Sequence, residues 1–248
     1  MFSAGDRDSI RGRLLDLADR DPAVVGAAIT GSEAVGSGDR WSDIDLAFGI
    51  DGSVDEAMRR WTDSLYDDFA AVHHWDLSSG PTTYRVFLLA GLLEVDLAFT
   101  PSADFGPRGP SWRTVFGDPA VSFPAAVPDR DTLAGLAWHH ALHARVCLQR
   151  GRLWQAEHWI GALRGQVIAL ACVRLGLPAS NAKGAHLLPA EVTSSLAATL
   201  VRTLDHAELH RALQAAAIAL AAEFERTDPA LFARLDPVLT ELRVSGRR

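Results

Sequence analysis

Two aspartates in the first quarter of the chain have a spacing that suits metal-assisted chemistry. Asp43 and Asp45 are separated by Ile44 and followed by Leu46. In an extended strand, both carboxylates leave one face while the two apolar side chains are buried on the other. Two like charges this close are costly unless something neutralises them, and Mg²⁺ binds one or two carboxylates together with phosphate oxygens and water. The pair predicts a magnesium site; a solvated acidic pair at a strand edge is the alternative.

A third carboxylate lies in an apolar run. Asp96 stands in residues 92–100, LLEVDLAFT, a pattern that indicates an interior strand, and a charge there needs a partner. If this strand lies beside that of Asp43 and Asp45, Asp96 completes three carboxylates around a pair of metal ions, the arrangement for in-line displacement at phosphorus. Glu94 shares the face of Asp96 by strand alternation and is a second candidate for base or outer-shell work.

A glycine and a serine precede the aspartate pair. Gly31 and Ser32 follow the apolar run 24–30, at a place where the backbone can approach a phosphate and present amides to it. A strand-to-helix turn without a ligand is the alternative. The loop before the pair supplies further nucleotide-binding candidates: Arg40 for a phosphate, Trp41 for the pocket wall, and Ser42.

These pieces together resemble a known family. The order of these motifs is similar to the signature of the DNA polymerase β-type nucleotidyltransferase superfamily: hydrophobic-Gly-Ser, then ten residues, then Asp-hydrophobic-Asp-hydrophobic, and later hydrophobic-Asp-hydrophobic. Within that superfamily, the chain resembles small bacterial antibiotic nucleotidyltransferases, notably aminoglycoside adenylyltransferases. The resemblance covers residues 24–100 and is only loose beyond them. It implies that Gly31 and Ser32 hold the triphosphate. It also implies three catalytic, metal-binding residues, the last of which binds the metal that activates the acceptor: Asp43, Asp45 and Asp96.

Lys183 is the only lysine among 24 basic residues. It lies in the sequence Ser-Asn-Ala-Lys-Gly at 180–184, between two helical patterns. This segment resembles a lysine-bearing loop of adenylyltransferases that meets the triphosphate across the cleft between domains. A compact ammonium suits a phosphate, so we expect Lys183 to bind the nucleotide; a surface lysine without a role is the alternative.

The second half of the chain offers weaker candidates for acceptor binding. Trp154 and Glu157 lie within one and a half helical turns and present an aromatic wall and a carboxylate. The general base stays open between Asp96, Glu94 and Glu157. A separate stripe at i, i+4 and i+8 suits packing better than a metal: His139, His143 and Cys147.

The elements that must position these residues fall into two groups around a proline-rich stretch. Six of the twelve prolines lie within residues 101–128, and proline removes a backbone donor and fixes φ, so we expect loop there. Before it, a helical pattern at 54–72 accompanies four short apolar runs: 24–30, 44–50, 84–90 and 92–100. After it come long helical patterns that predict four or five packed helices: 133–150, 153–176, 189–204, 206–226 and 228–243.

This order predicts an α+β fold with two domains. A mixed-sheet nucleotidyltransferase domain is expected at 1–105, a proline-rich connector at 106–130, and an α-helical bundle that contributes to nucleotide and acceptor binding at 131–248. A chain of 248 residues that is 48% hydrophobic can bury such cores.

The amino-acid composition limits the classes of partner that we expect for this protein. The net charge is −7, and residues 1–100 carry 18 acids against 8 bases, whereas residues 131–248 carry 10 against 13. An acidic surface argues against a polymeric nucleic acid as partner.

No run is long enough for a membrane span and the N-terminus lacks a signal-peptide core, so we expect a cytoplasmic protein with no membrane partner. Cys147 and Cys172 are expected as buried free thiols. The oligomeric state is left open.

The sequence thus predicts transfer of a nucleoside monophosphate, with ATP as the first choice of donor and two Mg²⁺ ions, to a hydroxyl of a small molecule, with release of pyrophosphate. An aminoglycoside or related antibiotic is the first choice of acceptor, because an acidic face suits a polycation. A nucleotidyltransferase that modifies a protein, as in toxin-antitoxin systems, and a nucleotide-binding module without catalysis are the alternatives.

Overall fold

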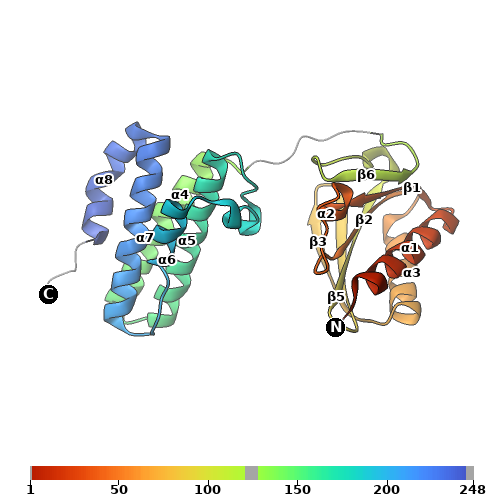
Figure 1. The fold of residues 1–248 in the computed structure, drawn as a ribbon, viewed down its shortest axis with the longest axis horizontal. Coiled ribbons are helices and arrows are strands. Elements are labelled where there is room, and N and C mark those ends of the chain that lie inside the picture. The colour runs from red at the N-terminus through yellow and green to blue at the C-terminus, as the bar shows by residue number, and fades with distance from the viewer. Residues whose placement is uncertain (1, 121–127, 244–248) are drawn as a thin grey trace. The chain divides into compact units, whose positions relative to one another are not determined.

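The protein folds into two compact units, Met1–Ala126 and Val127–Arg248. The computed structural model describes residues 2–120 and 128–243. Unit 1 is built on one mixed sheet, and unit 2 consists of α-helices (Figure 1). The predicted α+β class is therefore confirmed.

Unit 1 contains a six-stranded sheet in the order β3-β4-β5-β2-β1-β6. β2 and β5 at its centre pair in parallel, and the other neighbours pair antiparallel. Their apolar, β-branched and aromatic content favours strands. The bounds are β1 Val24–Thr30, β2 Ile44–Ile50, β3 Ala71–Ser79, β4 Thr82–Leu89, β5 Leu93–Pro101 and β6 Trp112–Phe116.

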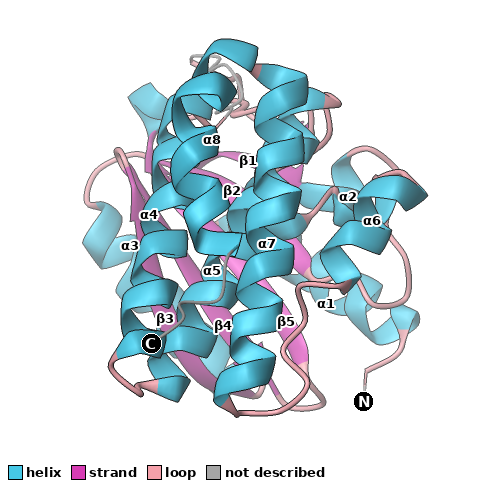
Figure 2. Cartoon of the chain, turned by 90° about the vertical axis from the view of Figure 1, so that its left-hand side faces the viewer, coloured by secondary structure: helices cyan, strands magenta, loops and turns pink. Residues whose placement is uncertain are grey.

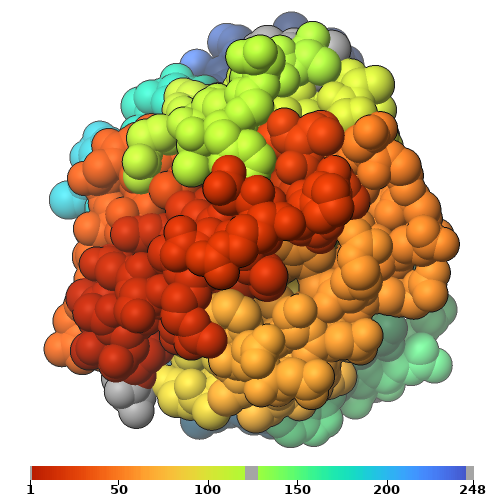
Figure 3. Space-filling view, turned by 90° about the vertical axis from the view of Figure 1, so that its right-hand side faces the viewer, coloured from red at the N-terminus to blue at the C-terminus, as the bar shows by residue number. Residues whose placement is uncertain are grey.

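Two helices cover one face of this sheet, α1 (Ala4–Arg20) and α3 (Val54–Asp68) (Figure 3). α1 begins at a capping box in which Ser3 accepts from the amide of Asp6 and the Asp6 carboxylate accepts from Ser3. Under the helices lies the apolar core, where Trp61 of α3 packs 4.6 Å from Phe48 of β2, measured between ring centroids. Burial of this face fixes the strand register, because a slip of one residue would expose every core side chain.

The opposite face of the sheet is covered only in part. Phe105 follows the short 3₁₀ turn η1 (Ser102–Asp104) and packs over two glycines of β1 and β2, Gly26 and Gly49. A Cβ at either glycine would overlap the ring, which explains why small residues stand there. Phe105 and Trp112, 5.2 Å apart, close this end of the open face.

Unit 1 differs from the sequence-based expectation at the end of one helix and in two additional strands. The helix expected over 54–72 ends at Asp68, where Ala70 takes a positive φ of 56°, and the chain turns into the unpredicted strand β3. The proline-rich stretch at 101–128, where only loop was expected, contains β6, which pairs with β1 at the edge of the sheet. Proline signals are local, and no local signal reveals pairing with a strand more than 80 residues away.

Unit 2 contains five α-helices among its described residues (Figure 2). A buried Glu223 of α7 accepts two hydrogen bonds from Arg174 of α5, at 2.8 and 3.0 Å, and so ties these helices together. Cys147 and Cys172 are buried free thiols, as expected. The helices are α4 Arg130–Gln149, α5 Leu153–Arg174, α6 Ala190–Ala197, α7 His206–Thr227 and α8 Pro229–Arg243.

One helix of unit 2 is much shorter than its pattern. α6 ends at Ala197 although the apolar pattern continues to 204. Arg211 of α7 donates to the carbonyls of Ala198 and Leu200, so the end of α6 finds its partners outside the helix. Among residues 2–120 and 128–243, no helix has the length and apolarity that crossing a membrane requires.

Candidate functional site

Asp45 and Asp96 are direct neighbours on the two central strands. β2 and β5 run in parallel, and Asp45 and Asp96 are register partners. Ile44, Leu46 and their partners on β5 are buried in the helix-covered core, so both carboxylates stand on the open face. Parallel pairing places the two chains about 4.8 Å apart. The adjacency that the sequence reasoning required for these two residues is observed.

Asp43 and Glu94 lie two residues before Asp45 and Asp96, respectively, along the chain. Asp43 directly precedes β2 and is half-buried, whereas Glu94 is exposed on β5 two residues before Asp96. The parallel register begins with Ile44 opposite Val95, so its continuation brings Asp43 level with Glu94. Asp45, Asp96 and Glu94 thus share one face of the sheet, and an extended backbone at Asp43 would add a fourth acidic residue to it.

Gly31 fits against Asp45 because it has no side chain. Its φ is +64°, and a Cβ built on it would overlap Oδ2 of Asp45. It opens the four-residue helix α2 (Gly31–Ala34) directly after β1. Only glycine meets both requirements without strain or displacement of the carboxylate. The glycine that the sequence reasoning assigned to a phosphate therefore also sets the position of Asp45.

Ser32 and Ser42 join the two sides of the intervening loop. Their hydroxyl oxygens lie 3.1 Å apart. Ser42 Oγ also accepts from the amide of Asp39 at 2.9 Å, and Asp39 Oδ1 accepts from the amide of Trp41 at 2.8 Å. These short-range bonds hold the segment that leads into the aspartate pair. Arg40 lies over the indole of Trp41, with 4.2 Å between guanidinium and ring centroid.

A buried arginine of α1 holds this loop from outside the motif. Arg7 donates to the backbone carbonyl of Asp39 and pairs with Glu33 of α2 at 3.0 Å. Arg7 is only 5% exposed, so its buried guanidinium needs these partners to balance its charge. Sequence reasoning missed Arg7 because nothing in its local pattern relates it to a loop more than 25 residues away.

Tyr84 and Arg108 border the carboxylates on the open face and were also missed. Tyr84 is half-buried on β4; burial, and secondarily the charge of Asp96, raise the pKa of its phenol, while Arg108 opposes the shift. Arg108 donates to Thr82 Oγ1 at 3.0 Å, and Thr82 is itself paired with Thr100 at 2.8 Å. Arg108 lies in the proline-rich stretch, where composition indicated only loop.

The acidic residues fit a cation that takes few ligands from the protein. Among the described residues, no group of three or more His, Cys, Asp and Glu side chains is arranged so that it could hold a metal ion. Asp45 and Asp96 stand on one row, with the Gly31 backbone beside them. This donor set of hard oxygens matches Mg²⁺, which is bound through one or two carboxylates plus substrate phosphates.

The remaining predicted residues lie in unit 2. Lys183 is exposed and follows the 3₁₀ turn η2 (Ser180–Ala182), which contains Asn181 with a positive φ of 51°. Trp154 is 77% exposed near the start of α5, and Glu157 is half-buried one turn later. Their roles in nucleotide or acceptor binding stay predictions.

The histidines of α4 pack around one tryptophan of α5. His139 and His143 have ring centroids 4.2 Å apart, and His143 and His140 lie 5.0 and 5.1 Å from Trp159. Burial, and then the neighbouring His139, lower the pKa of His140. This geometry agrees with packing, which the sequence reasoning preferred for the stripe.

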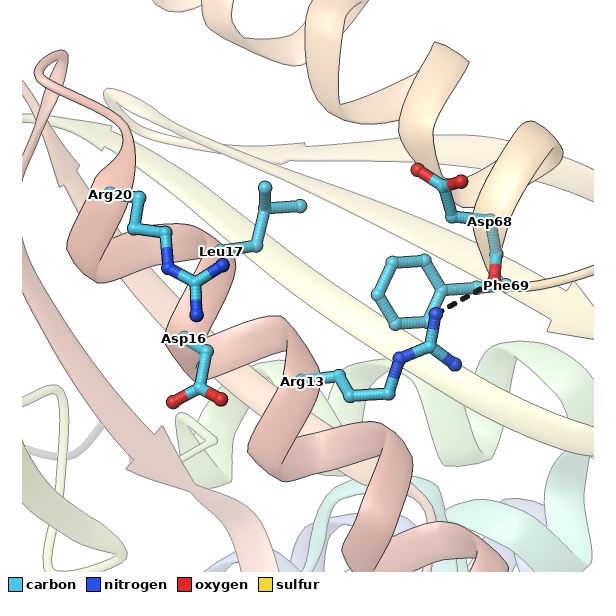
Figure 4. Close-up of a pocket in the computed structure, with 6 residues that line it drawn as sticks. All are labelled: Arg13, Asp16, Leu17, Arg20, Asp68 and Phe69. Carbon is cyan, nitrogen blue, oxygen red and sulfur yellow. Dashed lines mark hydrogen bonds between the residues drawn. The ribbon is translucent and has the colours of Figure 1, made fainter.

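A groove on the helix-covered face contains none of the predicted site residues. It is lined by α1 and the end of α3, with Arg13 stacked 4.3 Å over Phe69 and hydrogen-bonded to the Asp68 carbonyl at 3.0 Å (Figure 4). Asp45 and Asp96 stand on the opposite face of the sheet. This groove and the carboxylates therefore lie on opposite faces of the sheet.

Several solved structures are similar to this chain, and two of them are described here. No protein-family model and no curated protein sequence matches this chain. An aminoglycoside 6-adenyltransferase from Bacillus subtilis is 10% identical, with 99% of this chain and 100% of that chain covered and a TM-score of 0.42. A nucleotidyltransferase-like protein from Exiguobacterium sibiricum 255-15 is 12% identical, with 96% and 87% covered and a TM-score of 0.39.

Proposed function

We propose that this protein is a nucleotidyltransferase that moves a nucleoside monophosphate, with ATP as donor, to a hydroxyl group of a small molecule and releases pyrophosphate. The observation that carries the proposal is the pairing of Asp45 with Asp96 on adjacent parallel strands, with Gly31 fitted against Asp45. Two carboxylates beside a close-approach glycine are what a magnesium-bound triphosphate needs.

In this proposal, Asp43, Asp45 and Asp96 hold two Mg²⁺ ions. When bound, the ions lower the pKa of the acceptor hydroxyl and neutralise charge on the phosphates. The backbone of Gly31 and the hydroxyls of Ser32 and Ser42 bind the triphosphate on the β1 side of Asp45. Arg40 is a further candidate for a phosphate contact.

The acceptor then lies on the β5 side, over Asp96. Asp96 orients the hydroxyl in line with the α-phosphorus, and Glu94 or Asp96 takes its proton; Glu157 is a third candidate for this base. The bond from the acceptor oxygen to phosphorus forms as the bond to pyrophosphate breaks. Lys183 balances the charge that builds up on the β and γ phosphates.

A screen of nucleotides and acceptors, followed by pyrophosphate release, tests this proposal. The acceptors include aminoglycosides and related antibiotics, since the acidic open face suits cationic compounds. Magnesium-dependent pyrophosphate release with a labelled small molecule is the expected result. Label on a protein instead would select a protein acceptor. Binding of ATP·Mg with no transfer to any acceptor would show a nucleotide-binding module instead of an enzyme.

Lys183 gives a second test of the nucleotide site. Lys183→Ala should raise the KM for ATP about tenfold or slow turnover, with a smaller loss in Lys183→Arg, because that substitution keeps the charge but changes its geometry. Arg202→Ala, which alters an exposed residue of unit 2, serves as the control. Unchanged kinetics in Lys183→Ala would make this residue an ordinary surface lysine.

A further inference from the structure

The open face of the sheet continues from the carboxylates into an exposed apolar surface. Trp75 of β3 is the register partner of Val86 of β4, and Val86 is the partner of Asp96. Leu77 is likewise the partner of Tyr84. Trp75 and Leu77 are 54% and 52% exposed, although both are large apolar residues in a regular strand. We call Trp75, Leu77, Tyr84 and Leu88 the β3-β4 platform.

The platform faces the same side as the carboxylates and not the core. The alternate residues of β3 and β4 point to α3: Asp76 pairs with Arg85 at 2.7 Å, and Arg85 donates to Thr62 of α3 at 2.6 Å. His74 bonds Tyr66 of the same helix. By alternation, Trp75 and Leu77 must lie on the opposite, open face. Trp75 and Asp96 are two strands apart, a span of roughly 10 Å.

The order of the strands across the sheet indicates which substrate lies over the β3-β4 platform. Gly31, directly after β1, lies beside Asp45 on one side. On the other side of Asp45 lie Asp96 of β5 and then the strands β4 and β3. If the triphosphate binds on the Gly31 side, as the proposed function states, then the acceptor lies over β4 and β3. Its reactive hydroxyl has to reach Asp96, so the rest of the molecule extends over the platform.

The chemistry of the surface selects the class of acceptor. An exposed indole and two leucines bind a flat apolar or aromatic ring, not a molecule that is polar on all sides. Glu94 is the register partner of Leu88 and is exposed beside Asp96, so a carboxylate adjoins the apolar side chains and favours a cationic amine. Beyond Ala98 and Ala47, the half-buried Trp112 packs on Phe105 and adds further apolar surface.

We infer that the acceptor is a small hydroxylated amine with an apolar ring face, bound on the β3-β4 platform with its amine toward Glu94. This inference rests on the proposed function. Trp75 and Leu77 are specificity-determining residues in it: they bind the acceptor ring and take no part in the transfer. A polycationic sugar without an apolar face would leave the indole uncovered.

Calorimetry on the whole protein tests the inference in the presence of Mg²⁺ and the non-reacting nucleotide α,β-methylene-ATP. Propranolol and phenylalaninol serve as ring-bearing hydroxylated amines, and kanamycin as the polar polycation. We expect the ring-bearing amines to bind at least tenfold more tightly than kanamycin. Trp75→Ala should weaken them about tenfold, and Trp75→Phe about twofold or less, while nucleotide affinity stays unchanged.

Leu77→Thr and Val115→Thr form a matched pair, because both replace an exposed aliphatic residue on an edge strand with a residue suited to strands. Leu77→Thr should weaken the ring-bearing amines and Val115→Thr should not. Kanamycin binding with no effect of Trp75→Ala, or no binding of either ring-bearing amine to a protein that binds the nucleotide, would overturn the inference and leave the proposed function standing.

Two other results separate the remaining explanations. Failure of α,β-methylene-ATP to bind would overturn the proposed function itself, and the inference with it. A change from dimer to monomer in Trp75→Ala, measured by light scattering, would show that the platform is an interface between copies of the chain, and would also overturn the inference.

Discussion

At the scale of single residues, the site depends on how closely two carboxylates and a glycine approach one another. Asp45 and Asp96 stand side by side on parallel strands, and Gly31 leaves room for the Asp45 carboxylate. Like charges on adjacent strands repel each other, and a bound cation would relieve this repulsion.

Removal of either charge should therefore separate activity from stability. Asp45→Asn and Asp96→Asn should each lower nucleotidyl transfer by about a thousandfold or more, since several kcal/mol of charge stabilisation are lost. Their thermal midpoints should show that both variants stay folded. Asp51→Asn, at an exposed position after β2, is the control for both measurements. Full activity in either site variant would refute the metal assignment.

Gly31 allows a sharper test of geometry. Gly31→Ala and Gly36→Ala both place a side chain at a positive φ, 64° and 70°, and each should cost about 1–2 kcal/mol of unfolding free energy for that reason. Only the first substitution also displaces Asp45, because nothing lies within 4 Å of a Cβ at Gly36. We expect a large loss of transfer activity in Gly31→Ala and little in Gly36→Ala. Equal activities would show that the Asp45 position does not matter.

At the scale of elements, the central strands could be predicted from sequence and the edge strands could not. β1 and β2 match their apolar runs at 24–30 and 44–50, since buried strands have strong, continuous apolar patterns. β3 and β6 lie at the sheet edges and carry mixed or exposed side chains. Edge strands are defined by their partner more than by their own composition. The site residues missed, Arg7, Tyr84 and Arg108, belong to elements whose place only tertiary structure reveals.

The packing of α5 against α7 in unit 2 should depend strongly on the buried carboxylate of Glu223. Glu223 is 2% exposed and bonded to Arg174 and Arg226. Glu223→Ala leaves Arg174 without its carboxylate and should cost about 3–5 kcal/mol of unfolding free energy. Glu225→Ala, on the same helix but exposed, should change it by less than about 0.5 kcal/mol. Denaturant titration distinguishes the two, and equal effects would exclude a special role of the buried pair.

The histidines of α4 should make the stability of the protein pH-dependent. The pKa of His140 in the folded protein is lowered by burial and by the neighbouring histidines. The unfolded chain therefore binds a proton more readily, and stability that is present above about pH 6.5 is lost as the pH falls toward the folded pKa. Burial likewise lowers the pKa of His210 on α7.

His140→Gln removes one of these groups. The thermal midpoint of the wild type should fall between pH 7.5 and pH 5, and that of His140→Gln should fall by less. Differential scanning fluorimetry at the two pH values measures both. An identical fall in the two proteins would assign the pH dependence to other groups.

At the scale of the whole molecule, the two units differ in charge and in architecture. Residues 1–100 carry 18 acids against 8 bases, and residues 131–248 carry 13 bases against 10 acids. Each unit has its own apolar core. The acidic unit contains the carboxylates that we propose as cation ligands, and the second unit contains Lys183, which we propose as a phosphate ligand.

The most direct measurement is diffraction from crystals of the whole chain soaked with Mn²⁺ and α,β-methylene-ATP, because Mn²⁺ can be located by its anomalous scattering. We predict an anomalous peak in contact with the carboxylates of both Asp45 and Asp96, with the triphosphate extending from it toward Gly31 and Ser32. A bound nucleotide elsewhere on the protein, with no peak between these two aspartates, would contradict it.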